Sequence, residues 1–244
     1  MFKRIKKRID DYVTRKLTKL LKEQKLAQQE QFSYTQLSQL FDTSHFIPMT
    51  TWSISPSTIL HVINDIEINQ RQCIVEFGSG ASTLYIAKYL KTTNHKAQFF
   101  SIESNEHWLS KLKLQVEAFQ LQDYVTLVYA PIEKVPAEFV FKAQETWYST
   151  VMLNEVLKMV DSIDLILVDG PFGGGTPFAR YSAVPFLKQK LTPDFSVFLD
   201  DSERDDEKEM ILEWKTMLDS NITYFKRYTM LSTDKSFESK PHKL

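Results

Sequence analysis

The chain has 244 residues and a net charge of −1 at pH 7; 43% of its residues are hydrophobic and 25% are charged. That composition supplies the core of one large domain and excludes a disordered chain, and the sequence contains no run of about 18 apolar residues that would cross a membrane as a helix. The single cysteine, Cys73, excludes a disulfide framework and a thiolate metal cage, and it favours a reducing, cytoplasmic location.

The first segment, residues 1–29, is predicted to form a basic amphipathic helix. Apolar residues recur there at steps of three and four, which puts them on one helix face. They are Phe2, Ile5, Ile9, Tyr12, Val13, Leu17 and Leu20. Lys and Arg fill the other face, so residues 1–25 carry ten basic side chains against three acidic ones and the remainder of the chain is acidic.

A basic amphipathic helix of this kind has four uses that the sequence leaves open. It lies on anionic lipid at the inner face of a membrane, it docks on a partner, it packs on a second copy of the chain, or it packs on its own domain. A basic arm on an acidic body is not typical of a nucleic-acid-binding domain, so no nucleic-acid partner is expected.

Residues 30–56 are polar and then interrupted by prolines, and they are expected to form a linker or lid. Trp52 in this segment would either cover a bound ligand or pack against the body. Ser57 is expected to cap a short helix, TILHVINDI, by accepting a hydrogen bond from its first turn. The main domain is therefore predicted to span residues 57–244.

From residue 72 onward, predicted strands alternate with predicted helices. The strands are CIVEFG, AQFFSIES, YVTLVYAP, IDLILVDG, SVFLDD and a final pair within ITYFKRYTML. The helices are STLYIAKYLK, NEHWLSKLKLQVEAF, a mostly helical connection over residues 132–161, ARYSAVPFLKQKL and ERDDEKEMILEWKTMLD. This order predicts an α/β fold with a Rossmann-like, doubly wound, mostly parallel sheet of seven strands.

Glycine is rare and concentrated. Average usage would supply about 17 glycines in a chain of this length, but there are six, and they fall in two places: Gly78 and Gly80, and then Gly170 with residues 173–175. Both places follow a predicted strand. Glycine is therefore expected where the backbone turns sharply or approaches a ligand.

Two glutamates accompany the first glycine turn. Glu76 precedes Gly78 at the end of a buried strand, and Glu103 ends the next strand, where a carboxylate accepts the hydroxyl hydrogens of a ribose. Thr83 stands where a dinucleotide fingerprint has its third glycine. Glu76 would repel a pyrophosphate but attract a cation, so the charges match S-adenosylmethionine (SAM) better than NAD.

Four segments in order, IVEFGSGASTLYIA, FFSIESN, IDLILVDGPFG and SVFLDDSERDDE, resemble the signatures of class I SAM-dependent methyltransferases. The resemblance covers roughly residues 50–230. It implies that Gly78, Ser79 and Gly80 line the methionine part of SAM with Glu76 beneath it, and that Glu103 holds the ribose beside Ser104. The cofactor-binding set is predicted to be Glu76, Gly78, Ser79, Gly80, Ser82, Glu103, Ser104 and Asp169.

Three aspartates are the predicted catalytic residues. Asp169 ends the fourth strand of the sheet, and Asp200 and Asp201 end the fifth, so all three are expected at its ligand-binding edge. They would hold Mg²⁺, which prefers oxygen ligands, or Asp169 would act as a base without metal. The pattern resembles catechol O-methyltransferase and macrocin-type sugar O-methyltransferases. At least one of Asp200 and Asp201 is also expected to cap the following helix, and Arg204 is expected to pair with Asp201 or Glu207.

The predicted function is O-methylation of a hydroxyl on a sugar, a polysaccharide or another small molecule, because the FGSGAST and VDGP–LDD segments look most like enzymes that modify glycans. Two alternatives remain. One is an NAD-linked oxidoreductase on the same kind of sheet. The other is a non-catalytic adaptor that binds the cofactor and is recruited through residues 1–29.

Overall fold

A seven-stranded sheet in the order β3-β2-β1-β6-β7-β9-β8 organises the computed structural model, which describes residues 2–42 and 46–242. The sheet strands are β1 (Cys73–Phe77), β2 (Gln98–Glu103), β3 (Thr126–Tyr129), β6 (Ile163–Val168), β7 (Leu191–Leu199), β8 (Asn221–Tyr224) and β9 (Thr229–Ser232). The first five run parallel, and β9 pairs antiparallel with both β7 and β8. The predicted fold class is confirmed.

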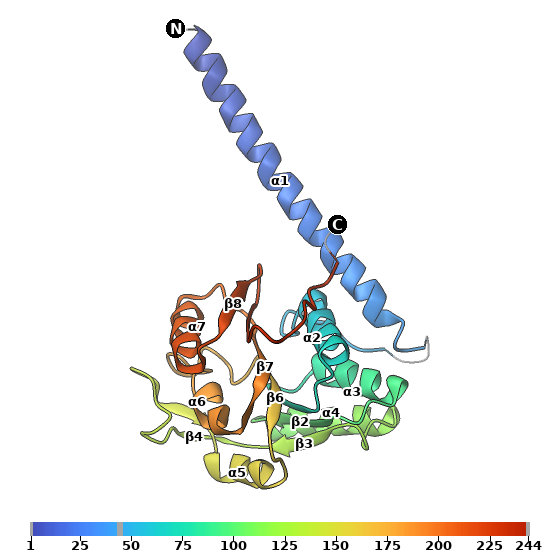
Figure 1. The fold of residues 1–244 in the computed structure, drawn as a ribbon. Helices are drawn as coiled ribbons and strands as arrows, with labels where there is room; N and C mark the ends of the chain where they lie inside the picture. The colour runs from blue at the N-terminus through green and yellow to red at the C-terminus, as the bar shows by residue number, and fades with distance from the viewer. Residues whose placement is uncertain (1, 43–45, 243–244) are drawn as a thin grey trace.

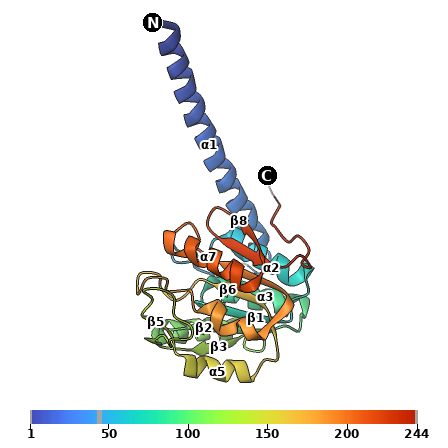
Figure 2. The same cartoon turned by 60° about the vertical axis from the view of Figure 1, so that its left-hand side comes forward.

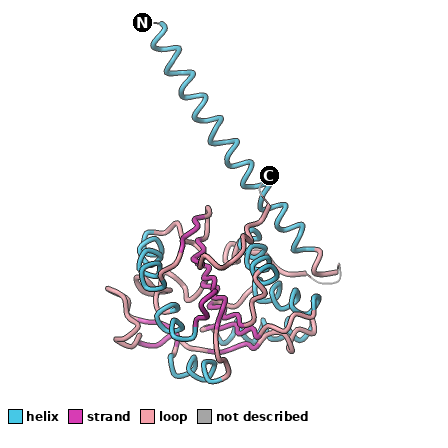
Figure 3. Tube along the Cα trace, in the orientation of Figure 1, coloured by secondary structure: helices cyan, strands magenta, loops and turns pink. Residues whose placement is uncertain are grey.

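Helices cover both faces of the sheet (Figure 1). They are α1 (Phe2–Ser38), α2 (Pro56–Ile68), α3 (Ala81–Thr93), α4 (Glu106–Ala118), α5 (Thr150–Lys158), α6 (Ala183–Leu187), the 3₁₀ turn η1 (Lys188–Lys190) and α7 (Asp205–Leu218). One apolar cluster joins α2, α3 and α4 to the sheet, and a second joins α5, α6 and α7 to it. The tube in Figure 3 shows the strands between these two helical layers.

The central strands β1, β2 and β6 end together at one edge of the sheet. Every residue of β1 and most residues of β6 are buried, because helices cover both faces of the parallel sheet and exclude water from them. The register pairs Phe77 with Val168 across β1 and β6, and with Ile102 across β1 and β2. The three strands therefore end level with one another, and the residues that follow them meet at one edge of the sheet.

The connection over residues 132–161 is where the structure departs most from the prediction. A two-stranded hairpin, β4 (Ile132–Lys134) with β5 (Thr146–Tyr148), precedes α5, so the segment is not mostly helical. Trp147 and Tyr148 in β5 are buried, and both rings lie against Phe77 of β1. This packing against the sheet decides the local structure, and sequence periodicity does not report it.

The helix predicted over ARYSAVPFLKQKL is much shorter. It spans only Ala183–Leu187 and continues as a 3₁₀ turn. Pro185 explains the late start, because proline has no backbone N–H and is tolerated only in the first turn of a helix. Residues upstream of Ser182 consequently form turns, which leaves Arg180 free to reach toward the sheet edge.

The boundaries at the N-terminal side also differ. Helix α1 continues to Ser38, past the predicted end at residue 29, because Ser33 and Leu37 are buried next to α2. Residues 30–38 therefore belong to the helix, and only residues 39–55 remain as a linker.

The cap of α2 is Ser55, whose hydroxyl accepts from the Thr58 amide at 3.3 Å, and not Ser57. Ser57 instead binds the carboxylate of Glu30 in α1 through its amide (3.0 Å) and hydroxyl (2.5 Å). This contact ties the base of α1 to the body.

Figures 1 and 2 show α1 from two sides as a rod that leaves the body near α2. No helix in the described ranges has both the length and the apolar composition needed to cross a bilayer.

Candidate functional site

A cavity of about 920 Å³ lies at the carboxyl ends of the parallel strands. Its walls are the turn after β1 (residues 78–82), the turn after β2 (residues 103–105), the loop after β6 (residues 169–172) and the linker segment 47–54. In a doubly wound sheet, ligands bind at this edge where the strand order reverses, which here is between β1 and β6.

Two glycines bring the floor of the cavity together. Gly78 has a φ of +96°, which side-chain-bearing residues rarely adopt, and a Cβ added there would lie 2.7 Å from the amide nitrogen of Gly170. A Cβ added at Gly170 would in turn lie 2.9 Å from the Cα of Gly78. The backbones after β1 and β6 therefore touch. Gly80 differs, because its backbone is extended and the space beside it is open.

Glu76 is fully buried beneath the first turn. Its Oε2 accepts hydrogen bonds from the hydroxyls of Thr83 and Ser101, both at 2.5 Å. Its Oε1 is buried and accepts no hydrogen bond of good geometry from the described residues, although the Ser82 hydroxyl lies close enough to the carboxylate to lower its pKa. Burial, only partly offset by the hydroxyl hydrogen bonds, raises the pKa of Glu76 to about 7. A buried carboxylate oxygen without a partner is costly in the free protein and suits a cationic or hydrogen-donating ligand.

Glu103 lies beside it at the end of β2. The amides of Ser104 and Asn105 donate to its Oε1, both at 2.7 Å, and hold the carboxylate at the cavity wall. Burial raises the pKa of Glu103, and these backbone hydrogen bonds oppose the rise. Trp108 also lines the cavity, and its indole N–H donates to the carbonyl of Ser79 at 2.8 Å.

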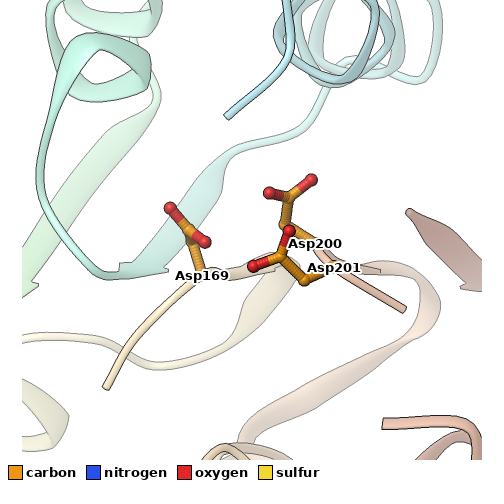
Figure 4. A group of neighbouring side chains, drawn as sticks. All are labelled: Asp169, Asp200 and Asp201. Atoms are coloured by element: carbon orange, nitrogen blue, oxygen red, sulfur yellow. The ribbon is translucent and has the colours of Figure 1, made fainter. Parts of the chain in front are cut away.

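The three predicted aspartates converge (Figure 4). One carboxylate oxygen from each of Asp169, Asp200 and Asp201 lies within 4.8 Å of the others. Asp169 and Asp201 line the cavity, whereas Asp200 is fully buried. Asp201 has a φ of +52°, an uncommon value for a residue with a side chain, and such backbone strain is typical of functional sites. Neither Asp200 nor Asp201 caps α7, because that helix begins later, at Asp205.

Arg180 is the central counter-charge of this cluster. Its side chain is 4% exposed. Its Nη2 lies 3.2 Å from Oδ1 of Asp169 and 3.6 Å from Oδ2 of Asp201. Its Nη1 donates to the carbonyl of Asp200 at 2.9 Å. One guanidinium thus joins the loops after β6 and β7 and orients Asp169.

Two further arginines complete the cluster. Arg204 lies 2.5 Å from Oδ2 of Asp201 and 3.7 Å from Glu207, so it pairs with both residues named for it in the sequence analysis. Arg227 lies 3.0 Å from Oδ2 of Asp200 and 3.2 Å from Oδ1 of Asp201. Three guanidiniums therefore face the three aspartates, and their formal charges cancel.

The donor atoms suit Mg²⁺, but the surrounding charges do not. Carboxylate oxygens are the ligands Mg²⁺ prefers, and the buried Oδ1 of Asp200 has no hydrogen-bond partner among the described residues. However, every one of the three carboxylates is already ion-paired with an arginine. A divalent cation would have to enter among three guanidiniums, so the site as it stands does not fit one.

Burial raises the pKa of two of these acids in spite of the arginines. It raises the pKa of Asp169, and the nearby Asp201 carboxylate adds to that rise while Arg180 opposes it. It also raises the pKa of Asp200, which the charge of Asp169 raises further. Asp169 is therefore a carboxylate at the cavity wall whose pKa has moved toward neutrality, which is the property of a general base.

The outer part of the cavity is aromatic. The rings of Trp52 and Phe172 lie 5.7 Å apart, and their side chains are 76% and 65% exposed. Phe172 directly precedes the glycine-rich residues 173–175. Its ring packs so closely over Gly174 that a Cβ added there would clash with it. Exposed aromatic rings beside a cavity offer faces on which a flat or sugar-like molecule stacks.

The structure brings all of the predicted cofactor-binding residues to one region: Gly78, Ser79, Gly80, Ser82, Glu103, Ser104 and Asp169 line the cavity, and Glu76 lies directly beneath. The sequence analysis missed Tyr148, whose phenol also lines the cavity beside Gly170. It belongs to the hairpin that was expected to be helical, and nothing in the sequence marks it.

Structural comparison finds the same fold in methyltransferases. An O-methyltransferase from Bacillus cereus in complex with SAH (S-adenosylhomocysteine) is 13% identical over 86% of this chain and 91% of its own, with a TM-score of 0.53. The SAH-bound Podospora anserina methyltransferase PaMTH1 is 15% identical over 86% and 88%, with a TM-score of 0.51. TomG, an O-methyltransferase from Streptomyces achromogenes in complex with SAM and involved in tomaymycin synthesis, is 13% identical over 78% and 93%, with a TM-score of 0.51. No family model and no curated protein matches the sequence.

The burial of Glu76 makes folding stability depend on pH in a defined direction. Its pKa is about 7 in the folded chain against an ordinary 4.5, so the folded state retains a proton that the unfolded state releases. This contribution is present below pH 4.5 and is lost as the pH rises through 7. Relative to Glu76→Gln, the wild-type free energy of unfolding should fall by up to about 3 kcal/mol across that window.

Urea unfolding of the ligand-free protein between pH 4.5 and pH 8 measures this difference. Glu106→Gln, at an exposed position in the first turn of α4, is the control and should follow the wild type. Parallel pH profiles for the wild type and Glu76→Gln would show that burial does not raise the pKa of Glu76.

Proposed function

We propose that this protein is a SAM-dependent methyltransferase that methylates a hydroxyl of a sugar, a polysaccharide or another small molecule. The observation that carries the proposal is the unpartnered, buried Oε1 of Glu76 beneath the turn at Gly78. It calls for a cationic ligand at the place where a doubly wound sheet binds nucleosides. The shared fold with SAM- and SAH-bound methyltransferases supports the same ligand.

The residues around the inner cavity fit SAM. Glu76 offers its free oxygen to the positively charged methionine part, and Glu103 offers a carboxylate to the ribose hydroxyls. The open space beside Gly80 leaves room for the ligand to approach the backbone. When bound, SAM supplies an electrophilic methyl group on its sulfonium.

Asp169 is the proposed general base. It lies between the cofactor part of the cavity and the aromatic outer part, where an acceptor would enter. A carboxylate there takes the proton from the acceptor hydroxyl, which raises the nucleophilicity of the oxygen. Arg180 positions this carboxylate through its contact at 3.2 Å. In this scheme Asp200, which is fully buried, stabilises the arrangement of Arg227 and Arg180 and does not touch the acceptor.

The aromatic outer cavity supports a sugar or a small ring as the acceptor. Trp52 and Phe172 offer ring faces, and Arg204 and Arg227 add partly exposed guanidiniums. Aromatic faces and hydrogen-bonding cations are the groups that hold hydroxylated rings in protein sites. The Mg²⁺ set Asp169, Asp200 and Asp201 stays a prediction from sequence, and no step of the proposed reaction depends on it.

Cofactor identity is the first test. Titration calorimetry should detect SAH binding, and Glu103→Gln should weaken it by about 10- to 100-fold, because a hydrogen bond to a charged group contributes about 1.5–3 kcal/mol. Glu106→Gln, three residues away and outside the cavity wall, is the matched control. Binding of NAD in preference to SAH would support the oxidoreductase alternative and contradict the proposal.

The role of Asp169 is the second test. Radiolabelled SAM is incubated with a panel of reducing sugars, nucleotide sugars and catechols, and labelled product is counted. Asp169→Asn should lower the rate by about 100-fold or more, since general bases contribute roughly that much. Asp205→Asn, at an exposed position in α7, should keep the wild-type rate. SAH binding without methyl transfer to any acceptor in the panel would favour the adaptor alternative.

The metal is the third test. Because three guanidiniums already neutralise the aspartates, we expect the same reaction to proceed at an unchanged rate in excess EDTA. Added Mg²⁺ should change the rate by less than about twofold, which is far below the effect of an essential metal. A loss in EDTA that Mg²⁺ restores would instead establish the metal set predicted from the sequence.

A further inference from the structure

The base of α1 is fixed to the body, and the rest of the helix is not. Ser33 and Leu37 are buried, the carboxylate of Glu30 binds Ser57, and the side-chain amide of Gln29 donates to the carbonyl of His242 at 2.6 Å. In contrast, every residue from 10 to 25 is exposed. Figures 1 and 2 show this part of the helix projecting away from the sheet and its helices. Packing of residues 10–25 on the chain's own domain is therefore excluded.

The projecting part carries a stripe of large apolar side chains that are 51% to 60% exposed. They are Tyr12, Val13, Leu17, Leu20 and Leu21. Scattered exposed apolar residues are normal on a protein surface, but a contiguous stripe of five on one helix marks an interaction site. This apolar stripe needs a partner that residues 26–42 and 46–242 do not supply.

The spacing of the stripe argues against a coiled coil with a second copy. Val13, Leu17 and Leu21 follow at steps of four, which move about 40° around the helix at each step. The stripe is therefore wide, whereas a coiled-coil seam is narrow and repeats every 3.5 residues. Val13, Leu17 and Leu20 follow the four-three spacing of a seam over one heptad, but the positions that would continue this seam, Asp10 and Gln24, are polar.

The charges point to an anionic surface. Residues 1–25 hold ten Lys and Arg against three Asp and Glu, and the projecting residues 10–25 hold five of the ten and all three acids, while the whole chain has a net charge of −1, so the body is acidic. An anionic surface attracts the arm and repels the body. A wide apolar face bordered by basic side chains is the composition of helices that lie in the plane of a bilayer interface.

We infer that the projecting part of α1, residues 10–25, lies on an anionic lipid bilayer with its apolar stripe among the acyl chains. The consequence for the cavity follows from the chain order. Residues 47–54 belong to the connection between α1 and α2 and form one wall of the cavity, and Phe46 and Trp52 in this connection are highly exposed. Docking of α1 therefore anchors the element that borders the acceptor entrance, and it favours acceptors held at a membrane surface.

Vesicle co-sedimentation of the full chain tests the inference. Vesicles of phosphatidylcholine with 30% phosphatidylglycerol should pellet the protein at 0.1 M NaCl, and pure phosphatidylcholine vesicles should pellet at least tenfold less. The triple variant Lys16→Glu, Lys19→Glu and Lys22→Glu should lower partitioning at least tenfold. Its control is the triple variant Lys111→Glu, Lys113→Glu and Lys134→Glu, which makes the same charge change at exposed positions of the body. The control should lower partitioning far less than the arm variant does.

The apolar stripe is tested separately. Leu17→Gln with Leu20→Gln keeps helix propensity and should lower partitioning at least tenfold, whereas Leu114→Gln with Leu212→Gln, at exposed positions of α4 and α7, should leave it unchanged. Circular dichroism and SAH titration check that each variant is folded. Because SAH binding is measured independently, failure of lipid binding and failure of the methyltransferase proposal are distinguishable.

Two results would overturn the inference. One is a wild-type protein that stays in the supernatant with the anionic vesicles. The other is a dimer in sedimentation equilibrium, with twice the chain mass of 28.5 kDa, that becomes a monomer in the Leu17→Gln, Leu20→Gln variant. The apolar stripe would then bind a second copy of the chain.

Discussion

Like-charge crowding at one edge of the sheet is the constraint on which the site depends. Level strand ends bring five carboxyl groups together: Glu76, Glu103, Asp169, Asp200 and Asp201. Burial makes their ionisation costly, so each ionised group needs a cation or a hydrogen-bond donor. On the aspartate side, three guanidiniums supply that charge. On the glutamate side, no buried cation is present among the described contacts, and the proposed sulfonium cofactor would provide the missing charge.

The division of charge separates two tasks within one cavity. The inner part is built from backbone turns and hydroxyl groups that surround Glu76, and it is suited to bind one cationic ligand. The outer part is built from arginines and aromatic rings that hold Asp169 in place beside an open entrance. Arg180 links the two parts of the cavity. It binds Asp169 in the loop after β6, and the next residue of that loop, Gly170, lies against Gly78 at the floor of the cavity. The orientation of the Asp169 carboxylate is thus determined by a residue that lies outside the strands.

The arm adds a further separation of charge, between an exposed basic helix and an acidic body. The segment that joins them forms a wall of the cavity, so the position of the arm and the shape of the entrance are physically connected. The base of the helix is held to the body by the contact of Glu30 with Ser57 and by the burial of Leu37. If the arm lies on a membrane as inferred, the proposed acceptors that reach Asp169 would be those held at that surface.

Local patterns in the sequence determined the strands of the seven-stranded sheet, most helices, the glycine turn and the identity of the acids at the sheet edge, because apolar periodicity and strand ends are encoded by neighbouring residues. Contacts between distant residues decided the rest. The burial of Trp147 and Tyr148 against β1 made a hairpin where a helix was expected. The ion pairs of Arg180 and Arg227 with the aspartates join segments far apart in the chain. Sequence spacing does not report such pairs, because their formation depends on how the sheet and its loops fold together.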